Sequence, residues 1–170
     1  SNARIPDGDA RGHQVVKFSP TGEVLIVLGT PGESGGGPDH FNAPADVVVA
    51  ENGDVFVADG HNNDGNGRVV KFDSDGNYVK DWGKPGYGPG EFRTLHTIAI
   101  DQRGRLFVGD RSNNRLQLFT KTESFSPSGL SLVDPVVSSL INMTISMLPI
   151  RSLTMCRTQA GKWAYVLGMH

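Results

Sequence analysis

Residues 41–83 read FNAPADVVVAENGDVFVADGHNNDGNGRVVKFDSDGNYVKDWG. Short apolar runs alternate in this stretch with turn pairs such as Asn52-Gly53 and Asp75-Gly76. Apolar runs of about four to six residues that are bounded by turn residues are typical of short β-strands. Glycine in such a pair accepts the positive φ that a tight hairpin needs. The stretch therefore predicts a four-stranded antiparallel unit.

The same unit recurs along the chain. Residues 92–119 read FRTLHTIAIDQRGRLFVGDRSNNRLQLF, in which Leu106–Asp110 aligns with Val55–Asp59 at an offset of 51 residues. An earlier partial copy, HQVVKFSPTGEVLIVLG at residues 13–29, matches the second half of the first unit. Four strands repeated every 40 to 50 residues or so is the period of a propeller blade. Residues 4–120 therefore predict about two and a quarter blades, too few to close a ring.

The composition supports an all-β chain and excludes other classes. The 22 Gly and 10 Pro among 170 residues favour many short strands joined by turns over a helical bundle. The chain has 16 Lys and Arg against 18 Asp and Glu, a net charge of -2. This balance argues against a basic surface for nucleic acid, including RNA, and against a polybasic membrane patch.

Targeting signals and cysteine chemistry are absent from the sequence pattern. No apolar run reaches the roughly 18 residues of a membrane span, and no signal peptide is found. The single cysteine, Cys156, excludes an internal disulfide framework and a multi-cysteine zinc site. Residues 1–3, Ser-Asn-Ala, are interpreted as the remainder of a cleaved expression tag.

An aspartate closes the second strand of each unit, at Asp59 and Asp110. A carboxylate at a strand end accepts hydrogen bonds from the following turn, so we expect both residues to be structural. The Asp-rich segment at residues 73–77 resembles the start of a calcium loop, but it lacks the distant bidentate Glu and is interpreted as a hairpin turn. The Gly-rich residues 29–41 and 83–92 are interpreted as loops between blades.

The pattern Phe-x-x-Pro-x-Asp, then Gly-x-apolar-Phe-Val-Ala-Asp, then Asn-x-Arg-apolar-x-x-Phe resembles the NHL repeat. The resemblance covers about residues 12–120 and is specific, because spacing and residue types recur together. It implies an incomplete β-propeller of four-stranded antiparallel blades, of a family that commonly has six blades.

Within NHL proteins the stretch is most similar to peptidyl-hydroxyglycine α-amidating lyase and its bacterial relatives. That resemblance implies a zinc held by three histidines from different blades, with a tyrosine and arginines near the substrate. His96 matches a family zinc-ligand position and Arg111 matches a family arginine. His61 stands where the lyase carries its tyrosine, and Leu95 replaces the usual proline before the ligand.

Structural alternatives stand beside these roles. His96 is also explained as a strand-end histidine with ordinary hydrogen bonds, because one histidine alone binds zinc weakly. His61 and His96 are candidates to face one end of the channel and share a metal. Arg111 and Arg68 are candidates to recognise a carboxylate, but we favour salt bridges or turn contacts to Asp59 or Asp110.

Residues 121–170 lack the repeat pattern and are predicted to be an irregular tail. They carry the only cysteine and all four methionines. Restoring one base before the Thr120 codon allows Thr120–Phe125 to be regrouped as Asp-Gln-Asp-Gly-Lys-Phe, the hairpin that the repeat requires. Further regrouping yields a Leu-Tyr-Val-Ala-Asp strand about 40 residues after Asp110, the distance that a blade period requires. We favour a frameshift, with an evolved tail as the alternative.

The sequence therefore predicts a truncated NHL-repeat fragment that acts at most as a ligand- or protein-binding scaffold, without an assembled active site. The alternative is a metal-dependent peptidyl-hydroxyglycine lyase-like enzyme, degenerate here or intact only in the full-length gene. No cofactor is expected for the first class, and zinc is expected for the second. Uncovered blade faces predict self-association into a homo-oligomer whose blades complete each other. The remaining partner is a small-molecule or peptide ligand, with no nucleic acid and no membrane.

Overall fold

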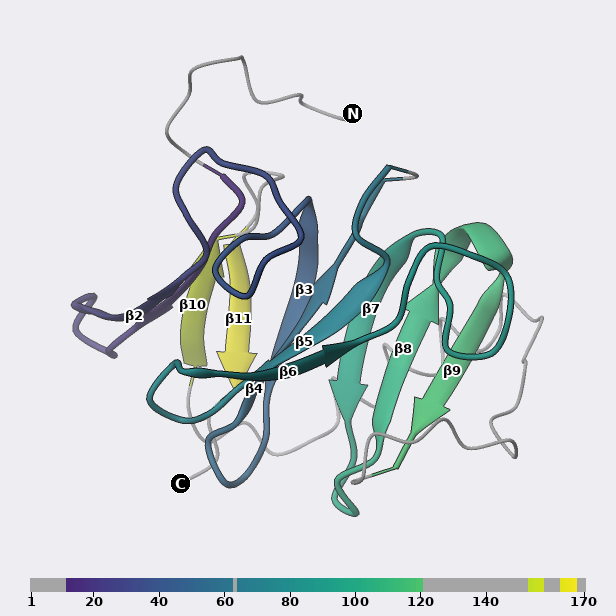
Figure 1. Ribbon diagram of the computed structural model, residues 1–170. Helices are drawn as coiled ribbons and strands as arrows, with labels where there is room; N and C mark the ends of the chain where they lie inside the picture. The colour runs from purple at the N-terminus through teal and green to yellow at the C-terminus, as the bar shows by residue number, and fades with distance from the viewer. Residues whose placement is uncertain (1–11, 63, 121–152, 158–162, 168–170) are drawn as a thin grey trace.

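The computed structural model describes residues 12–62, 64–120, 153–157 and 163–167 (Figure 1). Its strands and one 3₁₀ turn are β1 (Val15–Phe18), β2 (Val24–Leu28), β3 (Pro44–Val49), β4 (Val55–Asp59), β5 (Arg68–Phe72), β6 (Tyr78–Trp82), β7 (Leu95–Ile100), β8 (Leu106–Asp110), η1 (Arg111–Asn113), β9 (Arg115–Phe119), β10 (Leu153–Arg157) and β11 (Trp163–Leu167). Residues 1–3 and most of the predicted tail lie outside the described residues.

The described strands form four antiparallel sheets that follow the sequence repeat. Strands β1 and β2 form blade one, β3-β4-β5-β6 form blade two, and β7-β8-β9 form blade three. The fourth sheet is the hairpin β10-β11. The predicted all-β fold with antiparallel blades is confirmed. The tail, however, was predicted to be irregular, and its described residues form this hairpin. No helix among the described residues is long and apolar enough to cross a membrane.

The turn prediction is also confirmed. Gly53, Gly76 and Gly104 each have a positive φ at a hairpin between neighbouring strands. In the turn at residues 73–77, the carboxylate of Asp73 accepts hydrogen bonds from the backbone N–H of Asp75 and of Asn77. This segment is therefore a hairpin turn, as expected.

The core lies between blades, because each strand points alternate side chains to opposite faces of its sheet. One apolar cluster joins blades one and two, and its buried members are Val15, Leu28, Phe41, Val47, Val55, Val57, Val70 and Phe72. A second joins blades two and three, with Phe56, Ala58, Val69, Phe92, Leu95, Ile98, Leu106, Val108 and Phe119. Both faces of blade two are thus buried, which explains why β4 is buried along its whole length.

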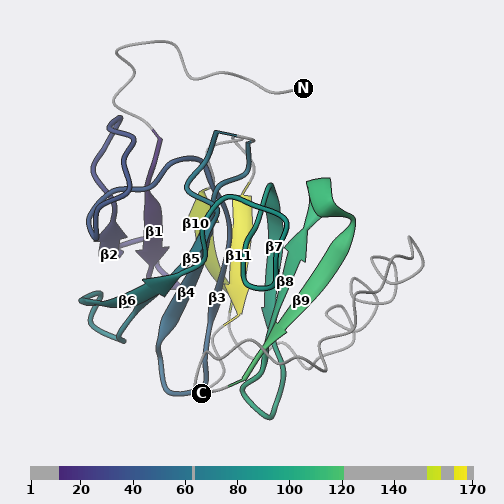
Figure 2. The same ribbon diagram turned by 45° about the vertical axis from the view of Figure 1, so that its right-hand side comes forward.

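The first strands of blades two and three, β3 and β7, lie side by side. The hairpin β10-β11 lies between β1 and β3 (Figures 1 and 2). Strand β11 thereby neighbours β3 as β3 neighbours β7. The candidate site lies at one end of these adjacent blades.

A buried aspartate–arginine pair anchors each blade to the loop before it. In blade two, Nε of Arg68 donates to Oδ2 of Asp59 at 3.0 Å, and its other nitrogens donate to the backbone oxygens of Gly36, Gly37 and His40. Asp59 also accepts from the backbone N–H of Asn42 and the side chain of Asn66.

Blade three repeats this arrangement. Nε of Arg115 donates to Oδ2 of Asp110 at 3.0 Å, and its other nitrogens donate to backbone oxygens of Tyr87, Gly88 and Glu91. Both aspartates are completely buried. The predicted structural role of Asp59 and Asp110 is therefore confirmed, and the two Gly-rich segments are the loops between blades that their arginines hold.

Candidate functional site

His96 owes its position to a β-bulge at the start of β7. Leu95 pairs with Asp110 and Thr97 pairs with Gly109, so His96 is the extra residue that β8 does not match. A bulge re-aims a side chain at the end of a strand, and bulges are common beside functional sites. Blade two has the same bulge at Ala45, between Pro44 and Asp46. The fold therefore offers one outward-turned position per blade, and only blade three fills it with a histidine.

His61 owes its position to a longer loop in blade two. The asparagine that binds the buried aspartate follows it by seven residues in blade two, at Asn66, and by three in blade three, at Asn113. The loop after β4 is thus four residues longer, and His61 lies in it. The backbone N–H of His61 donates to the carbonyl of Ala43 at 2.8 Å, which fixes the start of the loop.

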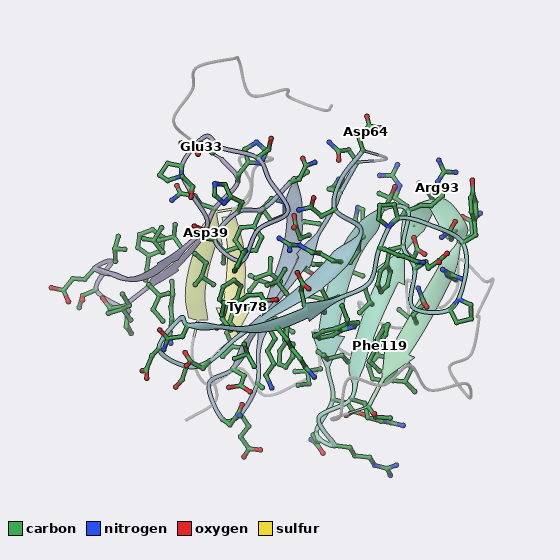
Figure 3. The ribbon with its side chains drawn as sticks, viewed as in Figure 1. Glu33, Asp39, Asp64, Tyr78, Arg93 and Phe119 are labelled. Atoms are coloured by element: carbon green, nitrogen blue, oxygen red, sulfur yellow. The ribbon has the colours of Figure 1, made fainter. Side chains whose placement is uncertain are left out.

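The two histidines meet across the junction of blades two and three. Their ring centroids are 5.3 Å apart, and the ring planes are inclined by 41°. The backbone N–H of Leu95 donates to the carbonyl of Gly60, so the residues before the two histidines are hydrogen-bonded to each other. Figure 3 shows Asp64, in the same loop as His61, and Arg93, just before β7, at one end of the molecule.

Arg111 belongs to the same cluster. It begins η1, directly after Asp110, and its backbone N–H donates to the carbonyl of Thr94. The pKa of His61 is lowered by burial first, and then by the positive charges of His96 and Arg111. The three sequence-predicted residues are therefore coupled electrostatically, with a half-buried His61 and an exposed His96 and Arg111.

Asp46 supports this cluster, and sequence reasoning missed it. Its Oδ2 accepts from the hydroxyl of Thr97 at 3.0 Å and from the backbone N–H of Ile98 at 2.9 Å. These are the two residues after the bulge at His96, so a carboxylate of blade two fixes the bulge of blade three. Burial raises the pKa of Asp46, while these donors and the charge of His96 oppose the rise. The available signal was the Pro-x-Asp of the repeat, which is replaced by Leu-x-Thr in blade three.

The two arginines differ from each other in role. Arg68 forms the predicted salt bridge to Asp59 and is buried, so it is structural. The predicted side-chain contact of Arg111 to Asp59 or Asp110 is wrong, because Arg68 and Arg115 hold these carboxylates. Within the described part of the chain, the guanidinium of Arg111 has no carboxylate partner.

The described residues supply only part of a zinc site. Within residues 12–62 and 64–120, no three His, Cys, Asp or Glu side chains gather closely enough to hold a metal ion. Catalytic zinc takes three protein ligands and an open position. His61 and His96 would provide two imidazoles, so a complete site would need a further ligand from elsewhere.

Comparison with known proteins agrees with this architecture. The family described as "6-bladed beta-propeller" matches residues 44–167. The human "NHL repeat-containing protein 3" is 40% identical over 114 residues, which are 65% of this chain and 32% of that protein.

Enzymes occur among the relatives too. The rat "Peptidylglycine alpha-amidating monooxygenase" is 38% identical over 122 residues, 66% of this chain and 12% of that protein. The Caenorhabditis elegans "Probable peptidyl-alpha-hydroxyglycine alpha-amidating lyase pgal-1" is 34% identical over 135 residues, 77% of this chain and 38% of that protein. The chain thus spans less than two fifths of each of these relatives. By its family match and its NHL-repeat relatives, this chain belongs to the 6-bladed β-propeller family.

Proposed function

We propose that this chain is a ligand-binding propeller module whose binding surface is formed by His61, His96 and Arg111, at the junction of blades two and three. The observation that carries the proposal is the meeting of two imidazoles from two blades, with ring centroids 5.3 Å apart, and the positive charge of Arg111 lowers the pKa of one of them, His61. The described side chains of this surface are two imidazoles and a guanidinium, which are groups that recognise anionic and hydrogen-bonding ligands.

The ligand that suits this surface is a small molecule or peptide end with a carboxylate. Arg111 is exposed and has no carboxylate partner within the described residues, so its guanidinium can donate two parallel hydrogen bonds to the two oxygens of a ligand carboxylate. His61 is neutral at neutral pH because its pKa is lowered, and it can donate or accept one hydrogen bond. Together these groups favour a carboxylate that carries a neighbouring hydrogen-bonding group.

The test is calorimetric titration of the chain with N-acetylglycine, compared with its methylamide, which lacks the charge. We expect the acid to bind and the methylamide to fail. Arg111→Gln should remove binding, whereas Arg103→Gln, an exposed arginine in the β7-β8 turn at the other end of the strand, should not. Equal binding of both probes, or loss with both variants, would contradict the proposal.

A second function, a metal-dependent lyase, is favoured by one observation. The bulge places His96, which matches a zinc-ligand position by resemblance, beside a second imidazole. Relatives named as amidating lyases of peptidyl-α-hydroxyglycine support the same reading. When bound, zinc would polarise an oxygen of the substrate, and Arg111 would bind its carboxylate.

This alternative makes a separate prediction. One zinc per binding site, lost in His96→Ala and kept in His40→Ala, together with cleavage of a peptidyl-α-hydroxyglycine, would establish a lyase. Binding of the carboxylate without zinc or turnover would leave the recognition module as the function. Metal content by plasma mass spectrometry and product analysis give these two results independently.

A further inference from the structure

We propose that two copies of this chain associate head to tail to close one six-bladed ring. The head is the face of blade one that is turned away from blade two, centred on Val16 and Phe18. The tail is the face of blade three that is turned away from blade two, centred on Phe107 and Leu116. This inference is independent of the proposed ligand, because it rests on the contacts between blades.

The junctions within the chain show what a blade interface requires. At the first junction, blade two presents Val70 and Phe72, which are 0% and 3% exposed. At the second junction, blade two presents its other face, with Phe56 and Val69 at 5% and 0%. Each blade therefore has one face that receives the preceding blade and another that packs against the following blade.

The head repeats the receiving face. Residues 14–18, Gln-Val-Val-Lys-Phe, align with Arg-Val-Val-Lys-Phe of β5, so Val16 and Phe18 correspond to Val70 and Phe72. Val15 and Leu28 pair with each other and point into the junction with blade two, so the adjacent pair, Val16 and Val27, points away from it. Val16 and Phe18 remain half-buried instead of buried.

The tail repeats the opposite face. Phe107 lies between Leu106 and Val108, which point into the junction with blade two, so Phe107 points away from it. By the 51-residue offset Phe107 corresponds to Phe56, and by the paired register of β9 Leu116 corresponds to Val69. Leu118 is the cross-strand partner of Phe107 and extends the apolar face. Phe107, Leu116 and Leu118 are half-buried.

Head and tail are thus the two halves of the interface that this chain already uses twice. A heterologous interface of this kind forms a closed ring when its rotation closes, and an open chain otherwise. In a six-bladed ring each blade turns through one sixth. The chain presents three successive blade positions, with β1-β2 and the neighbouring hairpin β10-β11 at the first, four strands at the second and three at the third, so two copies complete the turn. An exact number of copies, two, is therefore predicted.

The symmetry of the ring has a consequence for the candidate site. A twofold axis along the channel places both copies of the cluster of His61, His96 and Arg111 at the same end of one channel. A single copy contributes two histidines to this cluster, His61 and His96, and the ring of two copies would bring four histidines to one end of the channel.

Sedimentation equilibrium and light scattering of the full chain test the proposal. A mass of twice 18.2 kDa at micromolar concentration is expected. Val16→Asp and Phe107→Asp should each raise the dissociation constant of the dimer at least tenfold. Val79→Asp changes an exposed apolar position on β6 and should leave this constant unchanged. Circular dichroism and thermal melting show which variants fold, and only folded variants are compared.

Mixing the two variants separates this geometry from other dimers. The Val16→Asp copy keeps a normal tail and the Phe107→Asp copy keeps a normal head, so their mixture should form a heterodimer through one intact interface. Two copies that pair through identical patches would gain nothing from mixing. A monomer at micromolar concentration, or a dimer unaffected by both variants, would overturn the proposal.

Discussion

The imidazole rings of His61 and His96 lie 5.3 Å apart, although the two residues belong to different blades. Two local departures from the repeat bring them together: a longer loop after β4, and a histidine at the bulge position of β7 where blade two has Ala45. Neither departure is needed to bury an apolar residue. Both change which side chains reach the end of the junction, as a binding site built upon a regular scaffold requires.

The first prediction concerns the pH dependence of stability. The pKa of His61 is lowered in the folded chain, so the unfolded chain binds more protons as the pH falls. Its contribution is complete above its ordinary pKa of 6.5 and is lost as the pH falls below that value. From about pH 7.5 to about pH 5.5, the free energy of unfolding of the unsubstituted chain should fall more steeply than that of His61→Gln.

Denaturant titrations at each pH measure this difference. His13 and His40 also have shifted pKa values, lowered and raised respectively, but they are common to both chains and cancel in the comparison. Equal slopes for the two chains would show that the pKa of His61 is the same in the folded chain as in the unfolded chain.

The second prediction concerns the support of the bulge by Asp46. Asp46→Ala leaves the backbone N–H of Ile98 without its acceptor, which should cost about 1–3 kcal/mol of stability. Because the same carboxylate binds Thr97, the bulge and His96 should also move. Thermal unfolding gives the first effect, and a changed NMR signal of the His96 ring gives the second. Loss of stability with an unchanged His96 signal would limit Asp46 to a packing role.

The third prediction separates structural from functional charges. Asp59→Ala removes the fully buried one of the two carboxylates that Arg68 contacts, the other being Asp81. It also leaves the N–H groups of Asn42 and Asn66 without this acceptor, so it should destabilise the chain by about 3–5 kcal/mol. Lys84→Ala, which breaks a pair whose lysine is 73% exposed, should change the free energy of unfolding by at most about 1 kcal/mol. Denaturant unfolding measures both. A small effect of Asp59→Ala would show that the blade anchor is dispensable.

The fourth prediction concerns the gene. We predict that one added base before the Thr120 codon opens a frame that encodes further NHL units. Sequencing the source DNA across this codon and beyond the stop checks it. If no such frame exists, residues 121–170 are a genuine tail, and the hairpin β10-β11 between β1 and β3 becomes a native part of the fold.

Much of the fold could be predicted because the same pattern of strands and turns recurs several times in the sequence. The Asp59 and Asp110 networks, the hairpin turns and the antiparallel blades all follow from local spacing. Two histidines and an arginine were also identified, from resemblance. Their meeting was not derivable from spacing, because it depends on how the loop of one blade lies over the next.

The parts that sequence missed depend on contacts across blades. In the sequence Asp46 has the pattern of an ordinary strand residue. Only the packing of β3 against β7 shows that its carboxylate accepts hydrogen bonds from Thr97 and Ile98. Arg111 was paired with the wrong partners because Arg115, four residues later, follows the turn and reaches Asp110 instead. The strands of the tail have no repeat spacing, so the β10-β11 hairpin could not be predicted from the repeat pattern.

The most direct test of the central claim, that His61, His96 and Arg111 form one site, is histidine-selective NMR during titration with N-acetylglycine. We expect the ring signals of His61 and His96 to move together, with one saturation curve, while the signal of His40 stays unchanged. In Arg111→Gln both movements should disappear. Signals that do not move, or that move with different curves, would contradict a shared site.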